Sequence, residues 1–290
     1  MNGVENLVLR DRSALSDVAS AVVSDGIVTV DDVYSVNDLA QINAAMNPLF
    51  AARSARARAY VRPDDMLEAG ILDVVLSPRM RALMLTLMPD PVLYHLHAYE
   101  IAARSEKSHV FDNMPGGWHR DPDCAWFSDD PTHVSIFVYL SPVGEEDGPF
   151  EFSPQQPDED LRTDSPVLSM TGPIGTTFAW HRSFHHRASP NRGPRRRRLI
   201  KISVQRNAFS SIHLKQPFFA KLHSDIAPGD PFTDLLLGRY QGDEPPDLPP
   251  PDAVAGTRLR STRTVALPPE MLETMRKAEK ADASKPVAYD

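Results

Sequence analysis

The chain is poor in cysteine and in long apolar runs. Its one cysteine, Cys124, cannot form an intramolecular disulfide, which is typical of proteins from a reducing compartment. No apolar run approaches the roughly 20 residues that a membrane-spanning helix needs. The first residues, Met1 to Asn6, also lack the basic and apolar segments of a secretory signal. We therefore expect a cytoplasmic protein that does not bind membranes.

Positive charge is also in short supply. Lys and Arg number 31 against 39 Asp and Glu, which gives a net charge of −8. Such a balance gives no general attraction for nucleic acid or anionic lipid. The hydrophobic fraction of 41% and the charged fraction of 24% are those of an ordinary globular protein. We expect one domain over residues 1–290, and the sequence leaves its oligomeric state open.

The apolar pattern divides the chain into three parts. Residues 1–91 are mainly helical in pattern, with a short β-branched run between the first two helices; the expected elements are helices near 12–24, 36–50 and 80–87 and a strand at 26–30. Residues 92–206 carry strand patterns bounded by Gly and Pro; the expected strands are 92–101, 132–140, 149–152, 175–180 and 199–205. Residues 207–290 hold many of the 27 prolines and are expected to be irregular, with helices only near 233–239 and 269–281.

This order of elements predicts a mainly β (α+β) fold. Five strands separated by turn residues favour a double-stranded β-helix, the jelly-roll or cupin-like barrel, over residues 92–206. The N-terminal helices are then expected to pack on that barrel.

A His-x-Asp pair lies in the segment Trp118-His119-Arg120-Asp121. On an extended segment, residues i and i+2 point to the same face, so His119 and Asp121 would face one point. Imidazole and carboxylate suit Fe(II), and the lack of a thiolate argues against structural zinc. Two imidazoles and one carboxylate would fill three positions of the metal and leave three open.

The third ligand must come from a second strand, and three histidines compete for that role. They are His181, His185 and His186. As neighbours on a strand, His185 and His186 face opposite sides, so only one of them can reach the metal.

Further motifs follow the His-x-Asp pair in a fixed order. Gly148-Pro149 follows the strand at 132–140, Gly175 opens the strand that leads to His186, and Pro190-Asn191 precedes the basic run 195–198. Together with Trp118–Asp121, this order resembles the phytanoyl-CoA dioxygenase-type branch of the 2-oxoglutarate-dependent oxygenases. The resemblance covers about residues 94–206.

The resemblance implies the reaction and the metal ligands. Fe(II) would be held by His119, Asp121 and His186, the last chosen by its spacing to Pro190-Asn191, with His185 as the alternative. His181 then matches a histidine that is not a ligand in the family. The co-substrates would be 2-oxoglutarate and O₂, and the products succinate, CO₂ and a hydroxylated small molecule. A carboxylate at Asp121 favours hydroxylation over halogenation, because related halogenases have a small residue there.

The resemblance also implies an anchor for the far carboxylate of 2-oxoglutarate. Eleven residues beyond His186 it places Arg197, with Arg195 as the alternate; a planar guanidinium pairs with a carboxylate through two hydrogen bonds. The family often has a serine two residues after the distal histidine, where this chain has Ala188, so Ser189 is a candidate to replace it. A second departure is the turn at Pro154–Pro157.

Other interpretations of these residues stay open at this stage. The arginines of 195–198 also fit a solvated sheet edge. His95, His97 and Tyr99 share one strand face and would line the pocket or belong to a half-buried strand. Trp118 and Trp126 would wall the cavity or belong to the core, and Ser105–Gly117 would form a lid or a surface loop. The alternative functions are a non-catalytic or differently metallated cupin-like small-molecule-binding protein, and a metal-dependent hydrolase or isomerase.

Overall fold

The computed structural model describes residues 15–53, 58–105, 117–121, 131–155, 165–207, 217–239 and 257–258. Several expectations fall outside these ranges: Cys124, Trp126, the helix expected at 269–281, the proline-rich segment before it and most of the segment 105–117. Among the described residues, no helix is both long enough and apolar enough to cross a membrane.

Five helices come from the N-terminal part, and capping explains where two of them begin. They are α1 (Leu15–Ser24), α2 (Val36–Ala51), α3 (Pro63–Glu68), α4 (Leu72–Val75) and α5 (Pro78–Leu87). Ser35 begins α2 with a capping box: its hydroxyl accepts from the Asp38 amide, and the Asp38 carboxylate accepts from the Ser35 amide. Ser77 caps α5 in front of a proline at the first helical position. The predictions for α1, α2 and α5 are confirmed, whereas α3 and α4 are too short to give a periodic signal.

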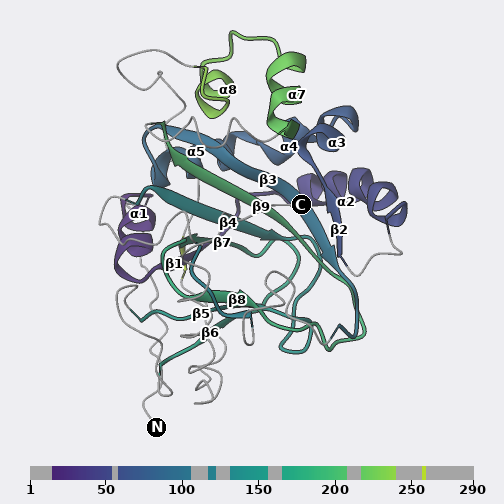
Figure 1. Ribbon diagram of the computed structural model, residues 1–290, viewed down its shortest axis with the longest axis vertical. Coiled ribbons are helices and arrows are strands. Elements are labelled where there is room, and N and C mark those ends of the chain that lie inside the picture. Colours follow the sequence, from purple (N-terminus) through teal and green to yellow (C-terminus); the bar gives the residue numbers. More distant parts are fainter. Residues whose placement is uncertain are drawn as a thin grey trace.

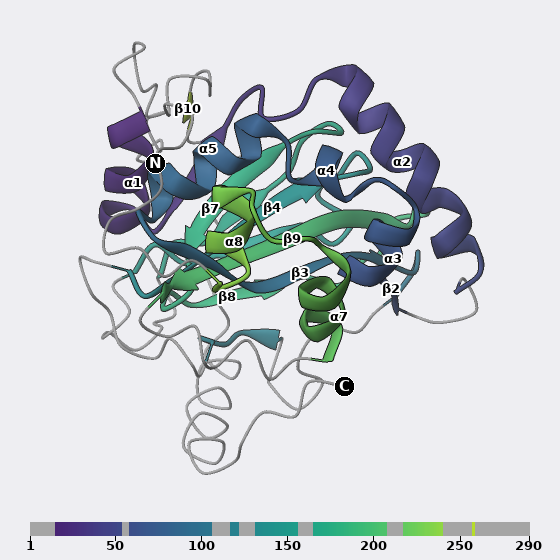
Figure 2. The same ribbon diagram turned by 90° about the horizontal axis from the view of Figure 1, so that it is seen from above.

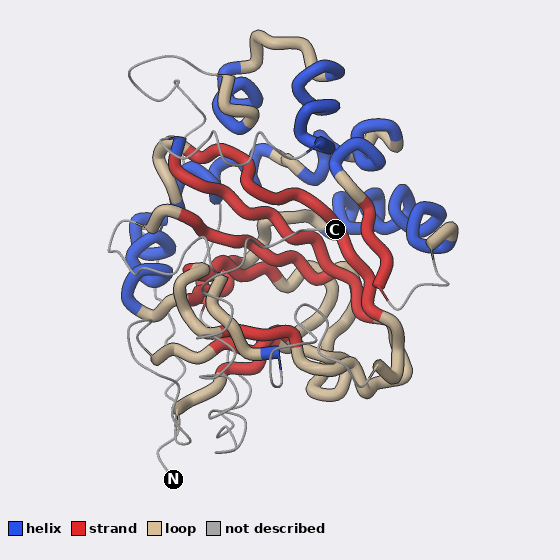
Figure 3. The backbone as a smooth tube through the Cα atoms, viewed as in Figure 1, coloured by secondary structure: helices blue, strands red, loops and turns tan. Residues whose placement is uncertain are grey.

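The strands form two antiparallel sheets, which is the jelly roll that the sequence predicts (Figures 1 and 3). The large sheet has the order β10-β1-β7-β4-β9-β3-β2; its strands are β1 (Ile27–Val30), β2 (Arg58–Val61), β3 (Pro91–Ile101), β4 (His133–Tyr139), β7 (Thr177–His181), β9 (Arg197–Arg206) and β10 (Thr257–Arg258). The small sheet has the order β6-β5-β8; its strands are β5 (Phe150–Phe152), β6 (Leu168–Met170) and β8 (His186–Ala188). The sequence pattern misses β2, β6 and β8, which have three or four residues each. The strands β1 and β5 are as short, but a β-branched run marks β1 and the Gly148-Pro149 turn marks β5.

The large sheet separates two hydrophobic cores. Figure 2 shows helices α1, α2 and α5 on one face of the sheet, and there Ile200, Ile202 and Val204 of β9 pack with the helix residues Ile42 and Met46. On the other face, aromatic side chains fill the space between the two sheets; they include Phe137, Phe150, Phe152, Phe178 and Trp180. The alternation expected for β9 is therefore confirmed, with its apolar face under the helices and the other face toward the barrel interior.

Tyr139 ties the two sheets together from within this aromatic core. It lies at the end of β4 and is fully buried. Its hydroxyl donates to the Met170 carbonyl of β6 at 2.7 Å and accepts from the Phe150 amide of β5 at 3.3 Å. Burial raises the pKa of Tyr139, so the hydroxyl keeps its proton and acts as a donor.

Among the described residues, two further helices follow the barrel. They are α7 (Pro217–Asp225), which the sequence pattern misses, and α8 (Pro231–Leu236). Asp230 caps α8 by accepting from the Thr233 amide at 2.9 Å, so the helix begins two residues before the predicted start at 233. In Figure 1 both helices lie above β3, and α7 lies beside α3 and α4.

The Gly148-Pro149 turn packs directly against the turn that contains Asn191. Gly148 has φ of +71°, and a Cβ atom there would lie 2.8 Å from the Ser189 carbonyl oxygen. Asn191 is fully buried, and its amide donates to the carbonyls of Ala102 and Arg195 at 3.1 and 2.8 Å. These bonds hold the end of β3 and the start of β9 at the Gly148 turn.

We predict that Gly148→Ala destabilises the fold more than Gly70→Ala does. Both glycines have a positive φ, but a Cβ atom at Gly70 would meet no atom within 4 Å. Gly70→Ala therefore carries only the backbone strain of about 1 kcal/mol, and Gly148→Ala adds a contact with backbone that cannot move aside. We expect the free energy of unfolding, measured with urea, to drop by at least about 2 kcal/mol for Gly148→Ala. Equal losses for the two variants would contradict this account of the turn.

Candidate metal centre

The segment that holds His119 and Asp121 pairs with the beginning of β8 through backbone hydrogen bonds. The His119 amide donates to the His186 carbonyl at 3.0 Å, and the His186 amide donates to the His119 carbonyl at 2.9 Å. This isolated antiparallel bridge sets the two histidines opposite each other, with their ring centroids 4.3 Å apart.

Three side chains meet at this bridge. His119, Asp121 and His186 each offer one ligand atom, and these atoms all lie within 4.8 Å of one another. All three side chains are buried. Within the described part of the chain this is the one such group, and neither His181 nor His185 belongs to it.

Backbone carbonyls orient both imidazoles. Nδ1 of His119 lies 2.7 Å from the Gly117 carbonyl oxygen, and Nδ1 of His186 lies 2.8 Å from the Phe184 carbonyl oxygen. Because a carbonyl only accepts, Nδ1 carries the proton in each ring and Nε2 keeps its lone pair. Burial lowers the pKa of His119 to about 4 and that of His186 well below its usual value. Both rings are therefore neutral near pH 7, the state in which imidazole binds a metal.

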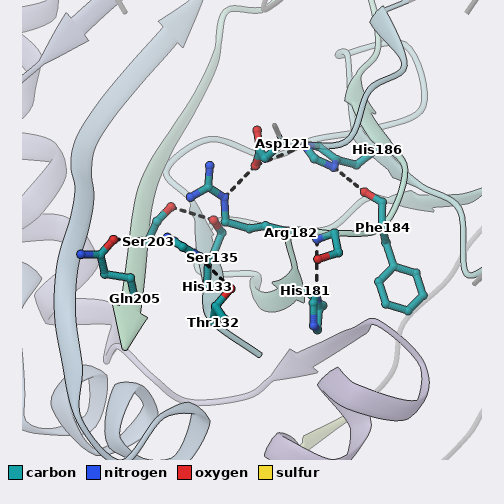
Figure 4. A network of polar contacts seen from close by, with 11 residues as sticks. Asp121, Thr132, His133, Ser135, His181, Arg182, Phe184, His186, Ser203 and Gln205 are labelled. Carbon is teal, nitrogen blue, oxygen red and sulfur yellow. Dashed lines mark hydrogen bonds and ion pairs between the residues drawn. The ribbon is translucent and has the colours of Figure 1, made fainter. Parts of the chain in front are cut away.

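A buried arginine holds the carboxylate of the group. Nε of Arg182 donates to Oδ2 of Asp121 at 2.7 Å, and the same oxygen lies 3.8 Å from Nε2 of His186 (Figure 4). Burial alone would raise the pKa of Asp121, but the charge of Arg182 beside it lowers this pKa well below its usual range. Asp121 is therefore ionised. The sequence reasoning missed Arg182; a single arginine among the aromatic residues and histidines of 177–186 was the signal that could have found it.

The two other histidines of the downstream run have separate places. His181 is buried; its Nδ1 accepts from the Ser183 amide at 3.2 Å, and its ring lies against Phe184. His185 is also buried, and its backbone carbonyl accepts from the Ser153 amide at 2.9 Å. The structure thus brings His186 alone of the three to His119 and Asp121.

The faces of β3 and β9 that point into the barrel carry a row of aromatic rings and polar groups. His95, His97 and Tyr99 form a chain of ring contacts with centroid distances of 6.0 and 5.7 Å. Lys201 of β9 lies opposite His97 in the register. The shared face expected for the three β3 residues is confirmed.

Two buried polar pairs join β4 to β9 next to Arg182, and the sequence reasoning did not single them out. Ser135 and Ser203 share a hydrogen bond of 2.7 Å, and Nε2 of His133 lies 3.2 Å from the Gln205 amide oxygen (Figure 4). Their positions on alternate residues of two strands were visible in the sequence, but the partner strand was not.

The two candidate anchor arginines lie in different surroundings. Arg197 is fully buried at the start of β9; its guanidinium donates to the Gly148 carbonyl and, at 3.2 Å, to the Tyr99 hydroxyl. No carboxylate of the described residues forms an ion pair with it. Arg195 precedes the strand; its side chain is 58% exposed and pairs with Asp147 at 2.5 Å. Because β9 begins at Arg197, the strand alternation expected for Arg195 does not apply.

Ser189 and Trp118 are held by neighbours rather than free in a pocket. The Ser189 hydroxyl donates to the Pro149 carbonyl at 2.8 Å. Trp118 is fully buried, and the Arg187 guanidinium stacks on its ring at 5.0 Å.

Comparison with known proteins agrees with this geometry. The family model of phytanoyl-CoA dioxygenase (PhyH) matches residues 22–199, more than half of the chain. A search of the curated proteins finds no match to this sequence.

Three solved structures show the same fold at low sequence identity. The epimerase SnoN, in complex with Fe³⁺, α-ketoglutarate and nogalamycin RO, has a TM-score of 0.54 and 20% identity, covering 88% of this chain and 99% of its own. EctD from S. alaskensis with bound Fe has a TM-score of 0.55 and 15% identity, covering 71% and 83%. The carbocyclase SnoK from nogalamycin biosynthesis has a TM-score of 0.51 and 14% identity, covering 68% and 87%.

The jelly roll, its buried His-Asp-His group and the family match define an iron- and 2-oxoglutarate-dependent oxygenase. The chain belongs to the phytanoyl-CoA dioxygenase family. Its cofactors are accordingly Fe(II), 2-oxoglutarate and O₂.

We predict that His97 makes the stability of the metal-free protein fall in mild acid. Burial, with Lys201 and Arg58, lowers the pKa of His97 to about 3. Below pH 6.5 the unfolded chain binds a proton at His97 that the folded chain does not, so stability that is complete above pH 6.5 is lost as the pH falls toward 3. The loss is at most about 1.4 kcal/mol per pH unit.

The variant His97→Phe isolates this contribution, because it keeps a ring and removes the titrating group. Urea unfolding of the metal-free proteins between pH 7 and 4 should give a shallower decline for His97→Phe than for the unmodified chain. Parallel curves would show that His97 is protonated equally in the folded and unfolded states.

Proposed function

We propose that the enzyme hydroxylates an unactivated C–H bond of a small molecule, with Fe(II) held by His119, Asp121 and His186. One observation carries the proposal: three buried donors of the right kind converge within 4.8 Å of one another. Iron, 2-oxoglutarate and O₂ together supply an oxidant strong enough to cleave such a bond. Release of succinate and CO₂ accompanies this chemistry.

The donor set fits Fe(II). Two neutral imidazoles present Nε2 lone pairs, an ionised carboxylate completes one face, and the group contains no thiolate. This combination with open positions is the arrangement of non-haem Fe(II) oxygenases. The carbonyls of Gly117 and Phe184 hold the proton on Nδ1 of each ring, so the chain itself keeps Nε2 directed at the centre.

Aromatic side chains pack against the proposed ligand His186. The ring of His186 lies 4.2 Å from that of Trp180 and 5.6 Å from that of Phe150, centroid to centroid. Such walls limit the approach of solvent to reactive species and favour transfer to a bound substrate.

Arg197 is the proposed partner of the far carboxylate of 2-oxoglutarate. Its support is a fully buried guanidinium with no carboxylate paired to it among the described residues, fixed by Gly148 and Tyr99 on the barrel interior. A buried cation of this kind gains most from a bidentate anion. Arg195 is less suited because it is exposed and paired with Asp147. We propose Ser189 as a neighbouring polar group that holds the turn beside Arg197 through Pro149.

The proposal also specifies which oxidative reaction takes place, namely hydroxylation. Solved structures of the same fold include an epimerase and a carbocyclase, so the fold alone does not choose among outcomes. The Asp121 carboxylate fills the position where a halogenase needs space for chloride, which supports hydroxylation over halogenation. Mass spectrometry of a metabolite library incubated with enzyme, Fe(II), 2-oxoglutarate and O₂ separates the outcomes: hydroxylation adds one oxygen atom, epimerisation leaves the mass unchanged, and cyclisation removes two hydrogens.

His186→Ala should abolish Fe(II) binding, whereas His185→Ala should retain it. Both histidines are buried neighbours, so the pair compares the loss of a proposed ligand with the loss of an adjacent imidazole. Anaerobic titration with Fe(II), followed by succinate formation in air, measures both. Full binding and turnover in His186→Ala, with loss of both in His185→Ala, would reverse the assignment. Absence of succinate from the unmodified enzyme with every candidate substrate would instead favour a cupin-like binding protein.

Arg197→Gln should raise the apparent KM for 2-oxoglutarate about a hundredfold, with a much smaller effect on the KM of the primary substrate. The substitution removes the cation and keeps much of the side-chain volume. Arg195→Gln is the matched control and should leave both constants nearly unchanged, because Arg195 lies outside and contacts Asp147. A similar rise in both constants for Arg197→Gln would count against this role.

A further inference from the structure

Arg182 contacts the group formed by His119, Asp121 and His186. The proposed reaction gives it no role so far. It is fully buried, directly follows β7, and contributes both its side chain and its backbone to Asp121. Nε donates to Oδ2 at 2.7 Å, and the Arg182 carbonyl accepts from the Asp121 amide at 3.4 Å. The guanidinium carbon lies 4.6 Å from the centre of the Tyr94 ring, which supports the guanidinium from one side.

These contacts fix which oxygen of Asp121 faces His186. Oδ2 is the oxygen that lies 3.8 Å from Nε2 of His186, and it is the same oxygen that accepts from Arg182. A carboxylate oxygen has two lone pairs. One lone pair of Oδ2 is thus directed at Arg182, and the other is available on the histidine side.

Rotation of the carboxylate about its Cβ–Cγ bond would break the contact with Arg182. A rotation that brought both oxygens of Asp121 to one ion would therefore cost this contact. Breaking a buried, charge-assisted hydrogen bond is costly, because both charged groups would lose their partner in a place that water does not reach.

The way in which Asp121 binds decides how many coordination positions stay open on the metal. An octahedral Fe(II) with His119, His186 and one oxygen of Asp121 keeps three positions. A 2-oxoglutarate molecule takes two of them, which leaves one for O₂. A second oxygen from Asp121 would fill that last position.

We propose that Arg182 is a positioning residue that keeps Asp121 bound to the metal through a single oxygen and so keeps the sixth position open. The inference rests on the proposed function, because it takes His119, Asp121 and His186 as the ligands. It assigns to Arg182 no contact with substrate, co-substrate or metal.

The test compares Arg182→Met with Arg182→Lys. Methionine has a similar length but no donor, whereas lysine restores a cationic donor. Nitric oxide serves as the probe of the sixth position, since it binds Fe(II) where O₂ would, and its complex has a characteristic electron paramagnetic resonance signal. The full-length proteins are loaded anaerobically with Fe(II) and 2-oxoglutarate and then titrated with nitric oxide.

We expect Arg182→Met to bind Fe(II) but to lose nitric oxide affinity at least tenfold, and Arg182→Lys to recover most of it. Arg206→Met is the control, because Arg206 also donates from Nε to a carboxylate, that of Asp90, at the far end of β9. It should bind nitric oxide like the unmodified protein. Unchanged nitric oxide affinity in Arg182→Met would overturn the proposal, as would an equal loss in Arg206→Met.

A second measurement does not depend on whether Arg182→Met folds. In a crystal of the unmodified protein loaded with Co(II), Asp121 should bind the ion through Oδ2 alone and keep its contact with Arg182. Two Asp121 oxygens on the ion, or an Oδ2 turned away from Arg182, would refute the inference while leaving the three ligands intact. If His119 or His186 does not bind Co(II) at all, it is the proposed function that fails.

Discussion

The backbone bridge between His119 and His186 is the contact on which the site depends. Two hydrogen bonds, of 3.0 and 2.9 Å, join a short extended segment to the beginning of the three-residue strand β8. The bridge sets the two rings opposite each other, and Asp121 follows two residues later on the same face. Each donor is then fixed by one further neighbour: the Gly117 carbonyl, the Phe184 carbonyl or the Arg182 guanidinium. The metal group is thus built mainly from main-chain geometry.

The aromatic core between the sheets supports that geometry. Trp180 and Phe150 pack on His186, and the Tyr139 hydroxyl joins β4 to β5 and β6 of the small sheet. Because this core is separate from the one under the helices, the interior of the barrel and the helical layer do not share side chains. The aromatic core therefore supports the His186 side of the site.

Much of this arrangement follows from sequence, and the exceptions have physical reasons. The alternation of residues 199–205 predicts β9 and both of its faces, because seven residues are enough to show a period of two. The strands β6 and β8 have three residues each, and their position depends on long-range pairing that no local pattern encodes. The same limit explains Arg182: its type was visible in the sequence, but its contact with Asp121, 61 residues earlier, comes from the fold. The strand alternation expected for Arg195 does not apply, because β9 begins only at Arg197.

The two faces of β9 have a consequence for how the family can vary. Ile200, Ile202 and Val204 point toward the helices, while Arg197, Leu199 and Lys201 belong to the opposite face. Deletion of one residue within this strand would exchange the two sets, placing a lysine under the helices and isoleucines toward the His119, Asp121 and His186 group. New substrate preferences can therefore arise along β9 only by substitution at every second position. Insertions and deletions are tolerated only in the loops at its two ends.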